Sequence, residues 1–367
     1  MLDVGGDMRV RVLCVVFTIL LGDFPGTFLG NPIGTRVGIS PFGQATTAYG
    51  QTSSKAADED TVSTDTAGNE PAREDSAKKQ LEVIVLGNAQ DAGYPQAGCD
   101  RECCKLARSN PSARRFATSL AIVDHANSKR YLFECTPDFR EQLYLLDQLA
   151  PIDSGRAKLD GIFLTHAHIG HYAGLIHLGR EVMSTDRLPV FCMPRMKAFL
   201  SSNGPWNQLV DLEQIQLKKL AAGQILSLGT SCSVVPFLVP HRDEYSETVG
   251  FEIALNECTM MFLPDIDKWE KWEVPIESLI ARCDMALLDG TFFDGSELPG
   301  RDMSQIPHPF ITESLSRFKK LPVGERRKIH FIHFNHTNPV LRAESDANRQ
   351  ILELQMHVAE QGQRFRF

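Results

Sequence analysis

Three histidines, His166, His168 and His171, lie within six residues, directly after the apolar run 161–164. The run predicts a short buried strand, so the histidines lie on the loop at its carboxyl end. In an extended loop, side chains two positions apart point to the same side, so His166 and His168 can bind one ion while His171 faces a neighbouring ion. Neutral imidazole is the commonest protein ligand of zinc and related metals. The cluster therefore predicts a metal site at the end of a strand.

A second cluster of metal-binding residue types precedes the first in the chain. Cys99, Cys103 and Cys104 follow a strand-like run at 81–86 and a loop at 87–97. Three thiols need a fourth ligand to complete a tetrahedral structural zinc, and His336 lies three residues after His333 near the carboxyl end. The alternative interpretation of the cysteines is a disulfide or free thiols.

The histidine cluster resembles the His-x-His-x-Asp-His signature of the metallo-β-lactamase superfamily, with Gly170 at the Asp position. Further members of the pattern occur in order: His241 after an apolar run, Asp265 at a strand end, and His333 at another strand end. The resemblance covers about residues 81–367. It implies an α/β fold, the αβ/βα sandwich of two mixed sheets flanked by helices.

The resemblance also implies a ligand for each metal position. The first metal would be held by His166, His168 and His241, the second by His171 and His333, and Asp265 would bridge them and take part in catalysis. Two neighbouring divalent ions lower the pKa of a shared water and so provide a nucleophile.

Gly170 departs from the family pattern and changes what we expect of the second metal. The Asp of the family supplies a ligand, a negative charge and a usual proton donor. Without it, we expect a weaker second metal, an excess of positive charge and a preference for anionic substrates. The alternative is that a water or a substrate oxygen fills the vacancy without consequence.

The cysteine cluster narrows the resemblance within the superfamily. Members similar to the carbon-phosphorus lyase pathway phosphodiesterase and to pyrroloquinoline quinone biosynthesis protein B carry such a cluster, and in the former a His three residues after the last active-site His completes it. Gly-Tyr-Pro-Gln at 93–96 and His-Thr-Asn-Pro at 336–339 resemble the quinone branch. The resemblance therefore implies a structural zinc held by Cys99, Cys103, Cys104 and His336, although the cysteine spacing departs from the usual Cys-x-Cys-x-x-Cys.

Four further residues are candidates for the surroundings of the metals. Glu134 and Asp138 lie in a segment that resembles a strand end of the superfamily, and either could hold a ligand histidine in place. Asp289 ends another strand and is a candidate catalytic or supporting acid, with a turn or cap role as the alternative. His308 lies in a predicted rim loop and is either a neighbour of a helix cap or a catalytic group.

Short apolar runs alternate with helical stretches from residue 81 onward, which favours two sheets covered by helices. The predicted strands are 81–86, 119–123, 131–134, 161–164, 189–192, 233–239, 249–254, 259–263, 285–288 and 328–333. The predicted helices are 139–149, 171–182, 195–203, 266–281, 310–319 and 339–361. Asn338 and Pro339 suit the start of the last helix, because Asn caps and Pro fits the first helical position.

Composition separates the first 80 residues from the rest. A short basic segment and an apolar run at 12–21 predict a signal peptide within residues 1–30, with a mispredicted start as the alternative. The polar, acidic stretch within 31–80 predicts a disordered linker, and residues 81–367 the metallo-β-lactamase-like domain. We therefore expect export to the periplasm or the exterior, and otherwise a cytoplasmic protein. The apolar run is too short to span a membrane.

The sequence thus predicts a metal-dependent hydrolase that uses a metal-activated water on a small, anionic ester or phosphodiester. One or two zinc ions are expected in the active site and one in the structural site, with iron and manganese as other metals. A metal-dependent oxygenase related to pyrroloquinoline quinone biosynthesis and a non-catalytic metal-binding homologue are the alternatives. The net charge of −8 and the lack of a long basic run argue against a nucleic-acid partner. The sequence does not indicate an oligomeric state.

Overall fold

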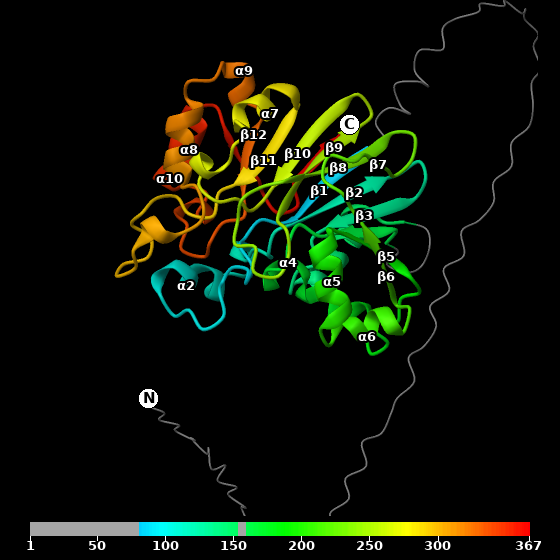
Figure 1. Ribbon diagram of the computed structural model, residues 1–367. Coiled ribbons are helices and arrows are strands. Elements are labelled where there is room, and N and C mark those ends of the chain that lie inside the picture. Colours follow the sequence, from blue (N-terminus) through cyan, green and yellow to red (C-terminus); the bar gives the residue numbers. More distant parts are fainter. Residues whose placement is uncertain (1–80, 153–158) are drawn as a thin grey trace, which may run out of the picture. The chain divides into compact units, whose positions relative to one another are not determined.

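The computed structural model describes residues 81–152 and 159–367, which form two mixed, seven-stranded sheets covered by helices (Figure 1). The predicted signal peptide and linker lie outside the described residues. Within the described ranges, no helix is long and apolar enough to cross a membrane. The predicted α/β sandwich of two mixed sheets flanked by helices is confirmed.

The first sheet has the strand order β14-β1-β2-β3-β4-β5-β6. Strands β14, β1, β2 and β3 pair antiparallel, and β3 to β6 pair parallel. The strands of this sheet are β1 (Leu81–Gly87), β2 (Ser119–Asp124), β3 (Lys129–Phe133), β4 (Gly161–Phe163), β5 (Leu188–Cys192), β6 (Ile215–Lys219) and β14 (Arg364–Arg366).

The second sheet has the order β13-β12-β11-β10-β9-β8-β7 and repeats the same mixture. Strands β7 to β10 pair antiparallel, and β10 to β13 pair parallel. Its strands are β7 (Leu226–Ser227), β8 (Cys232–Leu238), β9 (Val249–Leu255), β10 (Cys258–Leu263), β11 (Met285–Asp289), β12 (Ile329–Ile332) and β13 (His357–Val358).

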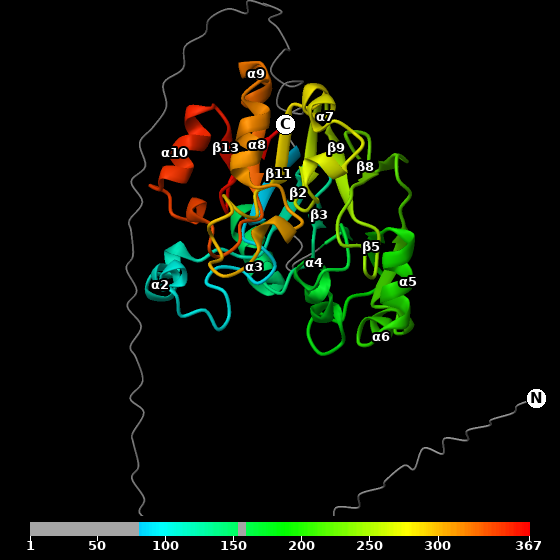
Figure 2. The same ribbon diagram turned by 60° about the vertical axis from the view of Figure 1, so that its left-hand side comes forward.

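Helices lie along the outer faces and on the connections between strands (Figure 2). The α-helices are α2 (Glu102–Ser109), α3 (Phe139–Leu149), α4 (Ile169–Tyr172), α5 (Pro194–Ser202), α6 (Trp206–Asp211), α7 (Ile276–Arg282), α8 (Ile311–Phe318), α9 (Val323–Arg326) and α10 (Asp346–Glu353). Short 3₁₀ turns occur at Pro111–Ala113, Ala173–Leu178, Trp269–Lys271, Met303–Gln305 and Pro339–Leu341.

Three apolar layers hold the sandwich together. In β1, Ile84 belongs to the core under α3 and α5, and its neighbour Val85 belongs to the core between the sheets. Burial on both faces explains why β1 reads as a continuous apolar run rather than an alternating one. The third layer packs α7, α8 and α10 against β10, β11 and β12. The sheets are thus fixed from both sides, which keeps their strand ends in defined positions.

Most predicted strands agree with the structure to within one or two residues, but of the predicted helix 339–361 only the eight residues of α10 are α-helical. Asn338 accepts a hydrogen bond from the Val340 amide, as a cap should, but it begins only a 3₁₀ turn. The helix α10 starts later, where the Ser345 hydroxyl accepts from the Asn348 amide. Beyond it, Gln355 has a φ of +59°, which ends the helix. The chain then runs along β12 as β13 and along β1 as β14.

The predicted helix 266–281 is shorter in the structure, because only a 3₁₀ turn precedes α7. The predicted helix 171–182 is likewise divided into the single turn of α4 and a 3₁₀ segment. Helices α2, α6 and α9 and strands β6, β7, β13 and β14 were not predicted from the sequence.

Candidate metal centre

The first group of predicted ligands lies on the loops that follow β4 and β8. His166 and His168 lie on the loop between β4 and α4, and His241 follows β8. The Nε2 atom of His166 lies 2.8 Å from Nδ1 of His168. The ring centroids of His168 and His241 are 4.9 Å apart. One ligand atom from each of the three lies within 4.8 Å of the others, so the structure brings them together.

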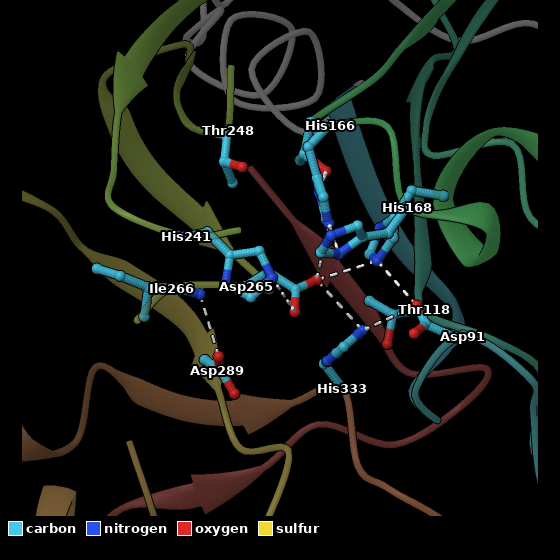
Figure 3. A network of polar contacts seen from close by, with 12 residues as sticks. Asp91, Thr118, His166, His168, His241, Thr248, Asp265, Ile266, Asp289 and His333 are labelled. Atoms are coloured by element: carbon cyan, nitrogen blue, oxygen red, sulfur yellow. Dashed lines mark hydrogen bonds and ion pairs between the residues drawn. The ribbon is translucent and has the colours of Figure 1, made fainter. Parts of the chain in front are cut away.

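The second group combines His171 in α4 with His333, which directly follows β12. Asp265, just beyond β10, lies between the groups. Its Oδ2 is 3.0 Å from Nε2 of His171 and 3.3 Å from Nε2 of His333, and its Oδ1 is 3.8 Å from Nε2 of His241. Figure 3 shows the side chains of His166, His241 and His333 around this carboxylate. The Asp265 carboxylate therefore contacts histidines of both groups.

The donor atoms of this centre fit divalent ions. Ligand atoms about 2.1 Å from one tetrahedral ion lie about 3.4 Å from one another, and the contacts of Asp265 cluster near that value. In the described part of the chain, the buried atoms of the centre without a hydrogen-bond partner include Nε2 of His171, His241 and His333, and one carboxylate oxygen each of Asp91 and Asp265. These nitrogen and oxygen atoms lie close to one another, but their angles do not allow hydrogen bonds between them. Buried polar groups normally have a partner, and shared ions would satisfy all of these.

The electrostatics of the two groups differ. Burial lowers the pKa of His241 to about 4, and burial also lowers the pKa of His166 well below its usual range. Both rings are therefore in the neutral form that binds metals. Burial alone would lower the pKa of His171, but the carboxylates of Glu134 and Asp265 raise it well above its usual range. The carboxylates around His171 thus stabilise a positive charge in the second group.

Neighbouring side chains hold the ligand rings in place. Oε1 of the buried Glu134 lies 3.4 Å from Nδ1 of His171, as predicted for one of two candidate acids. Thr165 Oγ1 lies 2.8 Å from Nδ1 of His166, and Thr291 Oγ1 lies 3.0 Å from Nδ1 of His333. Such partners fix the ring orientation of metal ligands. The second candidate acid, Asp138, instead accepts a hydrogen bond from the Ala117 amide.

Two residues of the centre have strained backbone conformations. Glu134 has a φ of +73° and His333 a φ of +69°, in the left-handed region that non-glycine residues seldom adopt. Such strain costs about 1–3 kcal/mol per residue and is concentrated at functional sites. Both residues directly follow strands, where the turn aims their side chains into the centre.

The predicted cysteine cluster also forms. Sγ of Cys103 lies 3.6 Å and Sγ of Cys104 3.3 Å from Nδ1 of His336, and Sγ of Cys99 lies 3.7 Å from Sγ of Cys103. Around one tetrahedral zinc, S–N and S–S distances are about 3.6 and 3.8 Å, whereas a disulfide is about 2.05 Å long. All three cysteines are free, so the structure does not show the alternative disulfide. Burial raises the pKa of Cys104 to about 12, and an ion would displace that proton.

A family model described as the β-lactamase superfamily domain matches residues 129–334, more than half of the chain. The chain belongs to the metallo-β-lactamase superfamily. The resemblance inferred from the sequence is thereby confirmed at the level of the superfamily.

Curated relatives extend the match beyond that domain. The chain is 28% identical over 294 residues to coenzyme PQQ synthesis protein B of Rhizobium meliloti (strain 1021), covering 73% of this chain and 92% of the relative. It is 27% identical over 306 residues to the protein of the same name from Methylococcus capsulatus, covering 76% and 98%.

Solved structures share the metallo-β-lactamase fold. Zinc-bound PqqB from Methylobacterium extorquens matches with a TM-score of 0.65 and 23% identity over 77% of this chain and 99% of that one. A diphosphatase of the PhnP family matches with a TM-score of 0.54 and 22% identity over 78% and 97%. At these identities, the structures establish the fold alone.

One residue of the centre was missed by the sequence analysis. Asp91, in the loop after β1, has its Oδ1 3.1 Å from Nε2 of His171 and 3.8 Å from Nε2 of His333. A Cβ atom on Gly170 would lie only 2.3 Å from this oxygen. The expectation of an open vacancy at position 170 is therefore wrong. The excess positive charge inferred from that vacancy, and the preference for anionic substrates based on it, lose their support. An acid in the loop after a predicted strand was the only sequence signal.

Asp289 does not face the ligand atoms directly. It is fully buried, and its Oδ2 accepts a hydrogen bond from the Ile266 amide and lies 2.8 Å from Nδ1 of His308. Its Oδ1 accepts from Thr291. Burial alone would lower the pKa of His308, but the carboxylate of Asp289 raises it. The contacts of Asp289 are those of a positioning residue, and they place His308 beside His241, with ring centroids 5.2 Å apart.

Proposed function

We propose that this chain is a metal-dependent hydrolase that cleaves an ester or phosphodiester bond at a centre of two divalent ions. The observation that carries the proposal is the convergence of unpartnered, buried donor atoms on the Asp265 carboxylate. Within the superfamily, the fold similarity to a PhnP-family diphosphatase supports hydrolytic chemistry of a phosphate compound.

Each group of residues has a distinct task in this proposal. His166, His168 and His241 would hold one ion, His171 and His333 the other, and Asp265 both. Bound there, such ions would supply a polarised substrate oxygen and a water whose pKa is lowered toward neutrality, the nucleophile of the reaction. The Asp265 carboxylate fixes the separation of the two groups, and Glu134, Thr165 and Thr291 fix the ring planes.

His308 is the residue that we propose as proton donor to the leaving group. It lies on the edge of the centre, with Nδ1 3.7 Å from Oδ1 of Asp265. Asp289 holds its orientation and favours its protonated form. General acids of this kind contribute typically 10²–10⁴-fold to a rate. The proposal gives Asp289 a role in catalysis through His308 rather than through contact with the substrate.

We further propose that the cysteine cluster holds a structural zinc. The four ligands join the first turn of α2 and the loop before it, which holds Cys99, to the segment after β12, which carries His333. The zinc named for the PqqB structure supports this choice of metal. The structural ion would therefore fix the position of an active-site histidine.

A second candidate function is oxidative. The curated relatives are named for the synthesis of coenzyme PQQ, and histidine with carboxylate is a ligand set that also suits iron. A non-catalytic role is the third candidate, but the complete set of donor atoms argues against it.

One experiment separates these functions. The purified protein is assayed by elemental analysis, by cleavage of bis(p-nitrophenyl) phosphate and p-nitrophenyl acetate, and by oxygen uptake. We expect hydrolysis of at least one ester, loss of that activity with a chelator, and recovery with Zn²⁺ or Mn²⁺. His168→Ala should abolish the activity, and His125→Ala, outside the centre, should not. Oxygen uptake without hydrolysis by an iron-loaded protein would contradict the hydrolase.

A further inference from the structure

The space beside residues 170 and 91 has room for the side chain of only one of them. A Cβ on Gly170 would lie 2.3 Å from both Cα and Oδ1 of Asp91 and 2.6 Å from its Cβ. Real Cβ atoms do not approach other atoms this closely, and the Asp91 backbone leaves no room to move aside. The Asp91 side chain thus lies where a residue-170 side chain would begin.

The Asp91 carboxylate is also aimed at the second group of ligands. Although the residue is partly exposed, Oδ1 itself is buried and lacks a hydrogen-bond partner. This oxygen and one ring nitrogen each of His171 and His333 lie within 4.8 Å of one another. The two histidines are almost fully buried, and both also face Asp265 Oδ2.

We propose that Asp91 replaces the signature Asp of the superfamily as a ligand of the second metal. The carboxylate is then supplied by the loop after β1 instead of by α4, and Gly170 is the substitution that makes room for it. This inference rests on the proposed two-ion centre but not on the reaction that it catalyses.

The loop that carries Asp91 is held against the segment that carries His333. The Gln90 amide donates to the Phe334 carbonyl at 2.7 Å, and the Phe334 amide donates to the Asn88 carbonyl at 2.8 Å. The Asn335 side-chain amide donates to Oε1 of Gln90 at 2.6 Å. These bonds lie just before Asp91 on one segment and just after His333 on the other, so they hold the two side chains near one another although the residues are far apart in sequence.

The cysteine cluster is a second contact between the segment that carries Asp91 and the segment that carries His333. Cys99, Cys103 and Cys104 follow Asp91 on one segment, and His336 follows His333 on the other. A carboxylate on a flexible loop would bind metal weakly because the loop must be ordered on binding. Here both ends of the loop are anchored, which makes Asp91 a pre-positioned ligand.

With the Asp91 carboxylate as a ligand, the centre has the same charge as a family centre with the signature Asp. The second metal should therefore bind as tightly as in a centre with the signature Asp. The two positions are interdependent. An acid at position 170 collides with Asp91, and removal of Asp91 leaves the second metal without a counterpart of the signature Asp.

Four proteins test the exchange: the unmodified chain, Asp91→Ala, Asp91→Asn and Gly170→Asp. Zinc per chain is measured by elemental analysis, and Zn²⁺ affinity by titration calorimetry of the metal-depleted protein. Asp91→Ala should contain one zinc fewer and bind it more than about a hundredfold more weakly, beyond the 10–100-fold loss typical for an outer partner of a ligand. Asp186→Ala, which removes an exposed carboxylate elsewhere, is the matched control.

Asp91→Asn decides between a ligand and a merely structural Asp91. Gly170→Asp should also lose the second zinc because the two side chains collide. Asp91→Asn should lose it as well, since the amide keeps the shape of the side chain but not the negative charge that holds a metal. Full second-site affinity in Asp91→Ala, or tighter binding in Gly170→Asp, would overturn the proposal. An unmodified protein without a second active-site ion would overturn it together with the two-ion centre. Two ions without hydrolysis would overturn only the proposed reaction.

Discussion

The two ligand groups of the centre are built in different ways. The first consists of histidines alone, from the loops after β4 and β8, and burial keeps His166 and His241 neutral. The second takes His171 from α4, His333 from the end of β12 and Asp91 from the loop after β1, and Glu134 lies against it. Asp265 is shared. The first group binds through neutral rings, whereas the second gathers carboxylates around histidine.

This difference indicates which parts of the molecule each metal depends on. The first group needs only the two loops that follow β4 and β8. The second needs three segments far apart in the sequence, two of which are joined by the cysteine cluster. We therefore expect the second metal to be the more sensitive of the two to changes outside the centre.

The largest effect should come from Asp265→Ala, because this change removes the shared ligand. Both active-site ions should be lost, leaving the zinc of the cysteine cluster, as measured by elemental analysis. Asp267→Ala is the control, since that carboxylate contacts Lys268 and Lys271 instead. If one active-site metal keeps its affinity in Asp265→Ala, the carboxylate is not shared.

His168→Ala should affect the first group selectively. Two remaining imidazoles cannot hold a tetrahedral ion tightly, so most of the first metal should be lost while the second stays. Titration calorimetry of this variant beside Asp91→Ala should give opposite patterns. Full occupancy of both sites in His168→Ala would refute the assignment of the first group.

Cys103→Ser should lower the metal affinity of the second group, although Cys103 is not one of its ligands. Loss of the structural zinc should lower Tm by about 5 °C or more, because metal binding contributes directly to folding. It should also weaken the second active-site metal more than the first. Cys258→Ser, a half-buried thiol at the start of β10, is the control for thermal unfolding and metal titration. An unchanged Tm and equal metal affinities would separate the cysteine cluster from the centre.

The smallest effects should come from the hydroxyls behind the rings. Thr291→Val removes the partner of His333, and Thr165→Val the partner of His166. Each should weaken only its own metal, by about tenfold, since outer partners of ligands typically contribute 10–100-fold. Identical losses at both metals in either variant would show that the two groups are not independent.

Local patterns in the sequence predicted the three histidines at 166, 168 and 171, and distant contacts explain what these patterns missed. His166, His168 and His171 are readable because they are close in sequence and follow a strand. His241, Asp265 and His333 required the family resemblance, which gives their order and strand-end positions. A lone acid such as Asp91 has no spacing signal, and Gly170 looked like a lost ligand until the loop after β1 was placed beside it.

The carboxyl-terminal region shows the same limit for the fold. Asn338 and Pro339 form a true cap, but the sequence does not reveal that only one 3₁₀ turn follows. Strands β13 and β14 have two and three residues and exist because they pair with β12 and β1. Edge strands this short have no periodicity of their own to be recognised.

The central claim is that two ions flank Asp265 and that Asp91 binds the second. Anomalous diffraction at the zinc edge from crystals of the zinc-loaded protein tests it most directly. The account predicts two peaks on either side of the Asp265 carboxylate, with Oδ1 of Asp91 about 2.1 Å from the peak between His171 and His333, and a third peak among the cysteines. A single active-site peak at His166, His168 and His241, with Asp91 turned away, would contradict it.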